Sequence, residues 1–336
     1  MKIPSVEAKP GEALIPSGTK RIIIFDTNAY RYFTTGCDWE ATKAKTAKLR
    51  EAEKAAGVMA LANPFVIWEL VGHLADQTDP HYTACLNALA SLATHTWDDK
   101  GGLRRIEDGE TAVCRQLFQV KPPKAGQNTN NLSLLAAHVR DFGPVITDQN
   151  ALTNFQVFAA KLAEYEARWL AEMQTVLDTF SPGLAKAWIG GNSDQETRKN
   201  VQKFFTSQQY MDLWAVAKIT SFAEVAGIKI SSDDLKPKVE LMKKVFPVPF
   251  HLMKTALKNW TGSKDFILSN PKRSRANFVW DTALCFSIGN HHQVGDASIT
   301  FITNDGAIKT AATDANCSAR VMTIDEYLTS ISFIAS

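Results

Sequence analysis

The chain has 336 residues, enough to bury a large core and to form two domains or one domain with a large insertion. Hydrophobic residues make up 45% and charged residues 21%, which is typical of a soluble globular protein and excludes no enzyme class. The 37 Lys and Arg against 35 Asp and Glu leave a net charge of +2, so overall charge argues neither for nor against a polyanionic partner.

Five widely spaced cysteines include no pair at the C-x-x-C spacing of zinc and redox sites, which predicts a reduced, cytoplasmic setting. Residues 1–17 contain no continuous apolar run, and no stretch approaches the ~18 apolar residues of a membrane span. We therefore expect a cytoplasmic protein with no membrane partner and with a flexible lead segment at residues 1–17.

The first predicted strand is the apolar run at residues 21–25, which ends at Asp26. A helix at residues 40–56 stops at Gly57, and a second short strand follows at 58–62. Asn63 and Pro64 are typical of a helix N-cap and first helical position, which predicts a helix at 65–75 that carries Glu69. A further helix is expected at about 81–94.

The middle of the chain is predicted to be helical. Residues 148–180 repeat apolar side chains at steps of three and four, and a Ser-Pro-Gly sequence closes the run. Residues 194–227 show the same pattern after a Gly-Gly-Asn break. We interpret residues 131–275 as an inserted, all-helical subdomain.

Alternation of helices and strands returns near the C-terminus and predicts a parallel sheet covered by helices on both faces. Asp281 lies in the first of these helices, and Asp305 follows the strand after it. The expected elements are a helix at 278–288, a strand at 299–302, a short helix at 306–312, a strand at 319–323 and a terminal helix that starts near residue 323.

The four acids Asp26, Glu69, Asp281 and Asp305 occur in an order and context that resemble the PIN-domain nucleases. The matching features are an acid after the first strand, a Glu early in a helix, an acid at the start of a later helix and a strand-ending Thr-Asn-Asp. The resemblance covers roughly residues 18–120 and 276–336.

The resemblance implies an α/β fold in which a PIN-like, Rossmann-like parallel sheet is flanked by helices. The first part of that domain is expected at residues 18–130 and the second at 276–336, on either side of the helical insertion. The implied activity is that of a metal-dependent endoribonuclease acting on single-stranded or structured RNA, as a toxin or defence nuclease. An inhibitory protein partner and a homodimer are alternatives that the residues leave open.

Metal chemistry explains why several acids should converge. Mg²⁺ and Mn²⁺ prefer hard oxygen ligands, and grouped carboxylates repel one another unless a cation relieves them. Asp26 is the expected primary ligand, with Asp281 and Asp305 completing the site and Glu69 holding a metal-bound water or acting as a base. Asn28 and Thr303 are candidate hydrogen-bond partners of these acids.

Residues 236–275 carry ten Lys and Arg against two acids, with aromatic residues such as Phe246 and Phe250 between them. This combination is typical of nucleic-acid surfaces, although a solvated lysine face over core aromatics would give the same pattern. The candidate RNA-binding residues are Lys254, Lys258, Lys272, Arg273 and Arg275.

Plainer structural roles compete with the proposed ones. Asp26 and Asp281 are also suited to cap helices, and Asp305 to form a turn with Gly306. His73, four residues after Glu69, lacks companion metal ligands and is interpreted as a satisfied surface or core histidine.

Two other functions remain open at this stage. One is a haloacid-dehalogenase-like phosphatase, although Asn28 stands where that family has Asp. The other is a catalytically weak PIN-like protein that serves as an RNA-binding module or scaffold.

Overall fold

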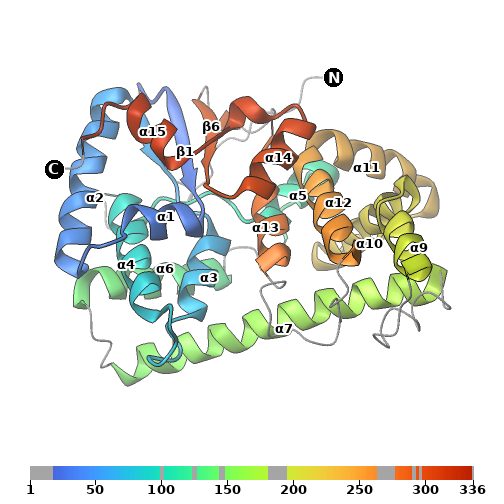
Figure 1. Cartoon of the computed structure of the whole chain (residues 1–336), viewed down its shortest axis with the longest axis horizontal. Coiled ribbons are helices and arrows are strands. Elements are labelled where there is room, and N and C mark those ends of the chain that lie inside the picture. The colour runs from blue at the N-terminus through green and yellow to red at the C-terminus, as the bar shows by residue number, and fades with distance from the viewer. Residues whose placement is uncertain are drawn as a thin grey trace.

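The fold is mostly helical and is built around one small sheet (Figure 1). The computed structural model describes residues 18–98, 102–122, 127–143, 148–180, 195–262, 277–289, 293–294 and 297–334. Within these ranges no helix combines the length and the apolar character that crossing a membrane requires. All five cysteines are free thiols.

The sheet is centred on strand β1 (Arg21–Phe25). It pairs in parallel with β2 (Val58–Ala60) on one side and with β6 (Ala297–Ile302) on the other. The far edge of β6 is shared by β5 (Gln293–Val294), antiparallel at its start, and by β7 (Val321–Met322), parallel at its end. The predicted parallel sheet is confirmed for β2, β1, β6 and β7, whereas the antiparallel β5 was not predicted.

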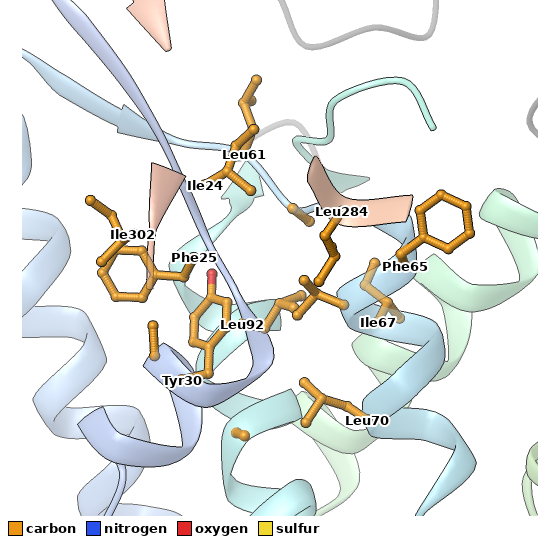
Figure 2. Close-up of a cluster of buried hydrophobic side chains, with 14 of the residues drawn as sticks. Ile24, Phe25, Tyr30, Leu61, Phe65, Ile67, Leu70, Leu92, Leu284 and Ile302 are labelled. Atoms are coloured by element: carbon orange, nitrogen blue, oxygen red, sulfur yellow. The ribbon is translucent and has the colours of Figure 1, made fainter. Parts of the chain in front are cut away.

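The run Ile22, Ile23 and Ile24 is fully buried because successive side chains of a strand point to opposite faces and helices cover both. Figure 2 shows one side of this core, where Ile24, Phe25 and Ile302 of the strands meet side chains from the helices. The sequence run that predicted a buried strand is therefore explained by this double cover.

Many of the described helices contribute to the hydrophobic core of the sheet. Those that neither enter the second core nor join the two cores are α1 (Thr27–Phe33), α2 (Trp39–Ala56), α3 (Pro64–Gly72), α4 (Tyr82–His95), α6 (Gln127–Phe142), α14 (Gly306–Asp314) and α15 (Ile324–Ser330).

Three of their predicted ends are confirmed. Gly57 ends α2 with a left-handed backbone (φ 69°), Asn63 accepts a hydrogen bond from the Phe65 amide at the start of α3, and Thr323 forms a capping box with Glu326.

A second hydrophobic core is enclosed by helices alone. Its members come from α5 (Gly109–Phe118), α9 (Gln195–Phe205), α10 (Gln208–Val225), α11 (Ser232–Val245), α12 (Pro247–Gly262) and α13 (Asn277–Cys285). The helical pattern predicted over 194–227 is confirmed, but it is divided into two helices because Ser207 caps a new helix by accepting from the Tyr210 amide.

The long helix α7 (Gln149–Phe180) joins the two cores and confirms the prediction at 148–180. Phe155 and Phe158 lie in the core of the sheet, and Trp169 lies in the second core. Figure 1 shows α7 running beneath both groups of helices. Helices of the segment predicted as an insertion thus contribute to both cores.

Other element bounds differ from the expected ones. The second strand ends at Ala60 rather than 62, and the helix expected at 278–288 ends at Cys285. The strand expected at 319–323 begins as a short 3-10 turn, Ser318–Arg320. A two-stranded ribbon joins β3 (Trp97–Asp98) to β4 (Gly102–Leu103).

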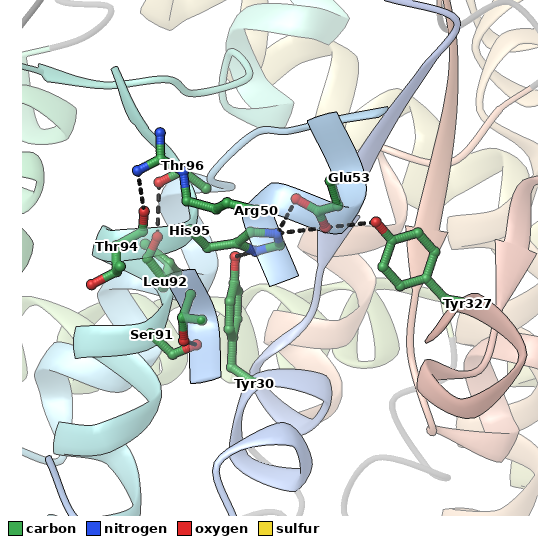
Figure 3. Close-up of polar contacts among 10 residues, drawn as sticks. Tyr30, Arg50, Glu53, Ser91, Leu92, Thr94, His95, Thr96 and Tyr327 are labelled. Carbon is green, nitrogen blue, oxygen red and sulfur yellow. Dashed lines mark hydrogen bonds and ion pairs between the residues drawn. The ribbon is translucent and has the colours of Figure 1, made fainter. Parts of the chain in front are cut away.

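A buried polar network joins four helices (Figure 3). The ring of Phe25 packs against three of its members, Tyr30, His95 and Tyr327. The Nε2 atom of His95 lies 2.7 Å from Oε1 of Glu53, and its Nδ1 atom lies 3.1 Å from the Tyr30 hydroxyl. The Tyr327 hydroxyl donates to the same Glu53 oxygen at 2.6 Å. The network ties α1, which begins beside Asp26, to α2, α4 and α15.

Candidate functional site

Asp26 lies at the carboxyl end of β1 and is almost completely buried, with 3% of its surface exposed. Its Oδ1 atom caps α1 by accepting from the Ala29 amide at 2.5 Å, and its Oδ2 atom accepts from the Thr303 hydroxyl. The parallel pairing of Phe25 with Ile302 explains this contact, because the next residue of each strand leaves the sheet at the same edge.

Thr303 connects two of the acids. Its hydroxyl donates to Asp26 and accepts from the Asp305 amide at 2.9 Å. Asp305 in turn caps α14, because its Oδ1 atom accepts from the amides of Ala307 and Ile308 at 2.7 and 3.0 Å. The capping role considered for Asp26 is therefore real, and Asp305 caps a helix as well, yet both side chains also lie beside the other acids.

Glu69 lies on α3 and is half-buried. Its Oε2 atom accepts a hydrogen bond from the Thr27 hydroxyl at 2.6 Å. Thr27 is a partner that sequence reasoning missed, although its position directly after Asp26 was a signal. Asn28 is exposed, and among the described residues no hydrogen bond joins it to the acids.

Asp281 lies inside α13, four residues after its first residue, so the capping role considered for it is wrong. Its side chain is half-buried, and α13 packs against α3, the helix of Glu69. Sequence reasoning placed Asp281 near the start of a helix. Packing of that helix, α13, against α3 is what brings Asp281 toward Glu69.

The four carboxylates lie within electrostatic reach of one another. Burial, together with the charges of Asp305, Glu69 and Asp26, raises the pKa of Asp281 to about 8. Burial likewise raises the pKa of Asp26 to about 7, although the hydrogen bonds from Thr303 and Ala29 oppose the change. The pKa of Glu69 is raised by burial and lowered in part by its bond from Thr27.

Three further charged residues lie within electrostatic reach of Glu69. Arg31 and His73 lower its pKa, and Glu166 of α7 raises it. The indole N–H of Trp280, the residue before Asp281, donates to Glu166 at 2.7 Å. Sequence reasoning missed Arg31, although it lies in α1, the helix that follows Asp26. It missed Glu166 because nothing local in the sequence brings α7 to this site.

His73 is satisfied as expected, since its Nδ1 atom lies 2.9 Å from the Asp79 carboxylate. It forms an ion pair with that carboxylate when protonated.

The donor set suits a divalent cation in its chemistry. Among the described residues, no three His, Cys, Asp or Glu side chains converge closely enough to hold a metal ion as they stand. Instead, Asp26 accepts a hydrogen bond from Thr303, Glu69 accepts one from Thr27, and Asp305 accepts from backbone amides. Mg²⁺ takes one or two protein carboxylates and keeps several waters, so a tight three-ligand cage is not required. A cation would relieve the charge repulsion that raises the pKa values of Asp26 and Asp281.

The basic stretch is only partly described. Lys254 and Lys258 are exposed on α12. This helix packs against α13, which carries Asp281, and against α14, which Asp305 caps. Phe246 and Phe250 are buried in the second core, so the prediction that they stack on nucleic acid is wrong. The remaining candidates Lys272, Arg273 and Arg275 lie outside the described residues.

The arrangement gathers four acids, one of them deeply buried and held by two hydrogen bonds, at the carboxyl edge of a parallel sheet. Open parallel sheets place their sites at this edge. Comparison of the chain with protein-family models, with curated proteins and with solved structures finds no match.

Proposed function

We propose that the protein is a metal-dependent endoribonuclease with a PIN-like domain and a helical insertion. One observation carries the proposal: four acids from separate parts of the chain lie within electrostatic reach of one another, so that Glu69 and Asp305 raise the pKa of Asp26 and all three raise the pKa of Asp281. Holding like charges together costs stability, and a function that needs a cation explains why the chain does so.

Each side chain has a distinct role in the proposed reaction. The bonds from Thr303 and Ala29 fix the orientation of Asp26, so this carboxylate is a preorganised primary ligand. Glu69, held from one side by Thr27, is oriented to accept a proton from an attacking water. Asp281 and Asp305 complete the negative site.

A bound Mg²⁺ or Mn²⁺ would lower the pKa of a water and neutralise charge on the scissile phosphate. Asp26, Asp281 and Asp305 are the residues that would hold it, directly or through water. Arg31 is close enough to Glu69 to lower its pKa, and it is a candidate to bind a neighbouring phosphate.

RNA is the proposed substrate because cations flank the site. Lys254 and Lys258 are exposed on α12, beside the helices of Asp281 and Asp305, and would bind the phosphates of a strand that enters there. Such contacts position a strand without reading its sequence, so we expect similar cleavage of RNAs with different sequences.

Cleavage of an end-labelled single-stranded RNA tests the proposal. We expect cleavage with Mn²⁺ or Mg²⁺, none with a chelator, and products that carry 5′-phosphate and 3′-hydroxyl ends. Asp26→Asn and Asp281→Asn should abolish it, since each amide removes a ligand charge but keeps the shape.

The matched control is Asp314→Asn, at the exposed last residue of α14, which should cleave like the original protein. Cyclic 2′,3′-phosphate ends formed equally well in chelator would overturn the proposal. So would an Asp281→Asn protein that cleaves at the original rate.

A further inference from the structure

A hollow with a free volume of about 550 Å³ lies beside β2, away from the four acids. Gly18 and Gly57 line it and precede β1 and β2, so the hollow reaches the amino edge of the parallel strands. Asp26, in contrast, follows the carboxyl end of β1. Small-molecule sites usually have volumes of about 300–1,000 Å³, so the hollow has room for an organic ligand.

One cation that lines the hollow lacks hydrogen-bond acceptors. The side chain of Arg104 is only 17% exposed, and its Nε atom is buried without a hydrogen-bond partner among the described residues. Arg104 forms an ion pair with Asp98, but the 3.6 Å between Nε and the carboxylate oxygen is too long for a hydrogen bond. A buried donor without an acceptor is costly. An anion in the hollow would satisfy it, because the planar guanidinium matches the oxygens of a phosphate or carboxylate.

Two further cations line the hollow from α2. The guanidinium of Arg50 donates to the carbonyl oxygens of Thr94 and Trp97 at 3.2 and 2.9 Å, and Figure 3 shows the first of these bonds. Lys54 is exposed in the last turn of α2. Arg50 therefore contributes a positive charge in a fixed place, and Lys54 contributes one on a flexible stem.

Two acids also line the hollow, but they are placed differently from the cations. Glu53 is buried, and its oxygens lie at hydrogen-bond distance from His95 and accept from the Tyr327 hydroxyl. Its hydrogen-bonding capacity is thus used inside the protein. Glu51 is exposed on α2, where water and salt screen its charge. The groups left to bind a ligand are therefore mainly cationic.

The rest of the wall is largely apolar. Val58, Met59 and Ala60 of β2 line the hollow, and Ala47 lines it from α2. A ligand of matching chemistry has an anionic end and an uncharged body. A phosphate monoester carries a charge of about −1.5 to −2 at pH 7 and three acceptor oxygens, and it therefore suits a group of cations better than a singly charged carboxylate does.

We propose that this hollow binds a small organic phosphate, with Arg104 and Arg50 binding the phosphate group and β2 contacting the organic body. The site is separate from the four acids and shares no residue with them. It therefore does not depend on the proposed nuclease function.

Glucose 6-phosphate and adenosine 5′-monophosphate are suitable probes, because one carries a sugar body and the other a nucleoside body. Calorimetry in chelator measures their binding without a metal that would hold phosphate at the acids. We expect at least one ester to bind, and glucose and adenosine not to bind. Binding of neither ester would overturn the inference, as would binding of inorganic phosphate as tight as that of the better ester.

Arg104→Gln removes the guanidinium and should weaken binding of the better ester by roughly tenfold or more, since a hydrogen bond to a charged group is worth about 1.5–3 kcal/mol. The matched control is Arg105→Gln, at the next residue, whose guanidinium donates to Ser133 and Asn130 instead. It should bind the ester like the original protein. Equal binding by the two variants would overturn the inference.

A second pair of variants tests the place of the ligand. Ala47→Phe fills the hollow from an exposed position of α2 and should weaken binding by a similar factor. Ala44→Phe adds the same ring at an exposed position of the same helix that does not line the hollow, and should bind the ester like the original protein. Thermal melts check that all four variants fold. Equal binding by Ala47→Phe and Ala44→Phe would show that the ester binds elsewhere and would overturn the site.

Discussion

Replacement of Asp281 by Asn should stabilise the metal-free protein, and more so at high pH. The pKa of Asp281 is raised from 3.8 to about 8 by burial and by the neighbouring acids. A carboxyl that binds its proton more tightly when folded contributes most to stability at low pH, and this contribution is lost as pH rises from about 4 through about 8. Asn does not titrate, so the variant keeps its stability where the original protein loses it.

The magnitude follows from the two pKa values. At about 1.4 kcal/mol per pKa unit, a rise from 3.8 to about 8 corresponds to about 6 kcal/mol in full. About 4 kcal/mol of this stability is lost between pH 5 and pH 9, since the remainder is already lost below pH 5. Water and counterions reach a half-buried carboxylate, so we expect about half, ~2 kcal/mol, to be measured.

Thermal melts in chelator at pH 5 and pH 9 measure the effect. The gain in Tm of Asp281→Asn over the original protein should be larger at pH 9 than at pH 5, by on the order of 5 °C. Asp314→Asn, an exposed carboxylate change on α14, should show no such pH dependence. Equal gains at both pH values, or a variant less stable than the original protein at pH 9, would refute the reasoning.

Two other changes test the supports of the site. Thr303→Val removes the hydroxyl that donates to Asp26 and should slow single-turnover cleavage roughly 10- to 100-fold, since a hydrogen bond to a charged group is worth about 1.5–3 kcal/mol. The control Thr310→Val, at an exposed position of α14, should cleave at the original rate. Equal rates for the two variants would contradict the role of Thr303. Tyr327→Phe removes a donor from buried Glu53 and should lower the free energy of unfolding by about 1–3 kcal/mol in urea melts; an unchanged midpoint would contradict it.

The local signals in the sequence were sufficient for most elements of the sheet. The Ile run of β1 predicts burial on both faces, and Gly57 and Asn63 mark helix ends through backbone conformation and capping that depend on a few neighbouring residues. The antiparallel β5 was missed because its two residues are too short to show any period. The break at Ser207 was missed because apolar spacing continues across it.

The site was predictable to the same extent. Asp26 and Asp305 follow strands whose parallel pairing brings them to one edge, so their proximity follows from topology. Thr27 directly follows Asp26, so its place at the site was a local signal. Its bond to Glu69 and the contribution of Glu166 depend on how α3 and α7 pack, which local patterns do not specify. Phe250 was misassigned because an aromatic residue between lysines has the same spacing whether it faces solvent or a core.

Proton release on binding of Mn²⁺ tests most directly whether the four acids form one cation site. At pH 7 a carboxyl with a pKa of about 7 is half protonated and one with a pKa of about 8 is about nine-tenths protonated, so a cation that ionises both Asp26 and Asp281 should release between about 1 and 1.5 protons. Calorimetry in two buffers of different ionisation enthalpy counts them. We expect this release from the original protein and only about 0.5 proton from Asp281→Asn. Binding without proton release, or no binding of Mn²⁺, would contradict the account.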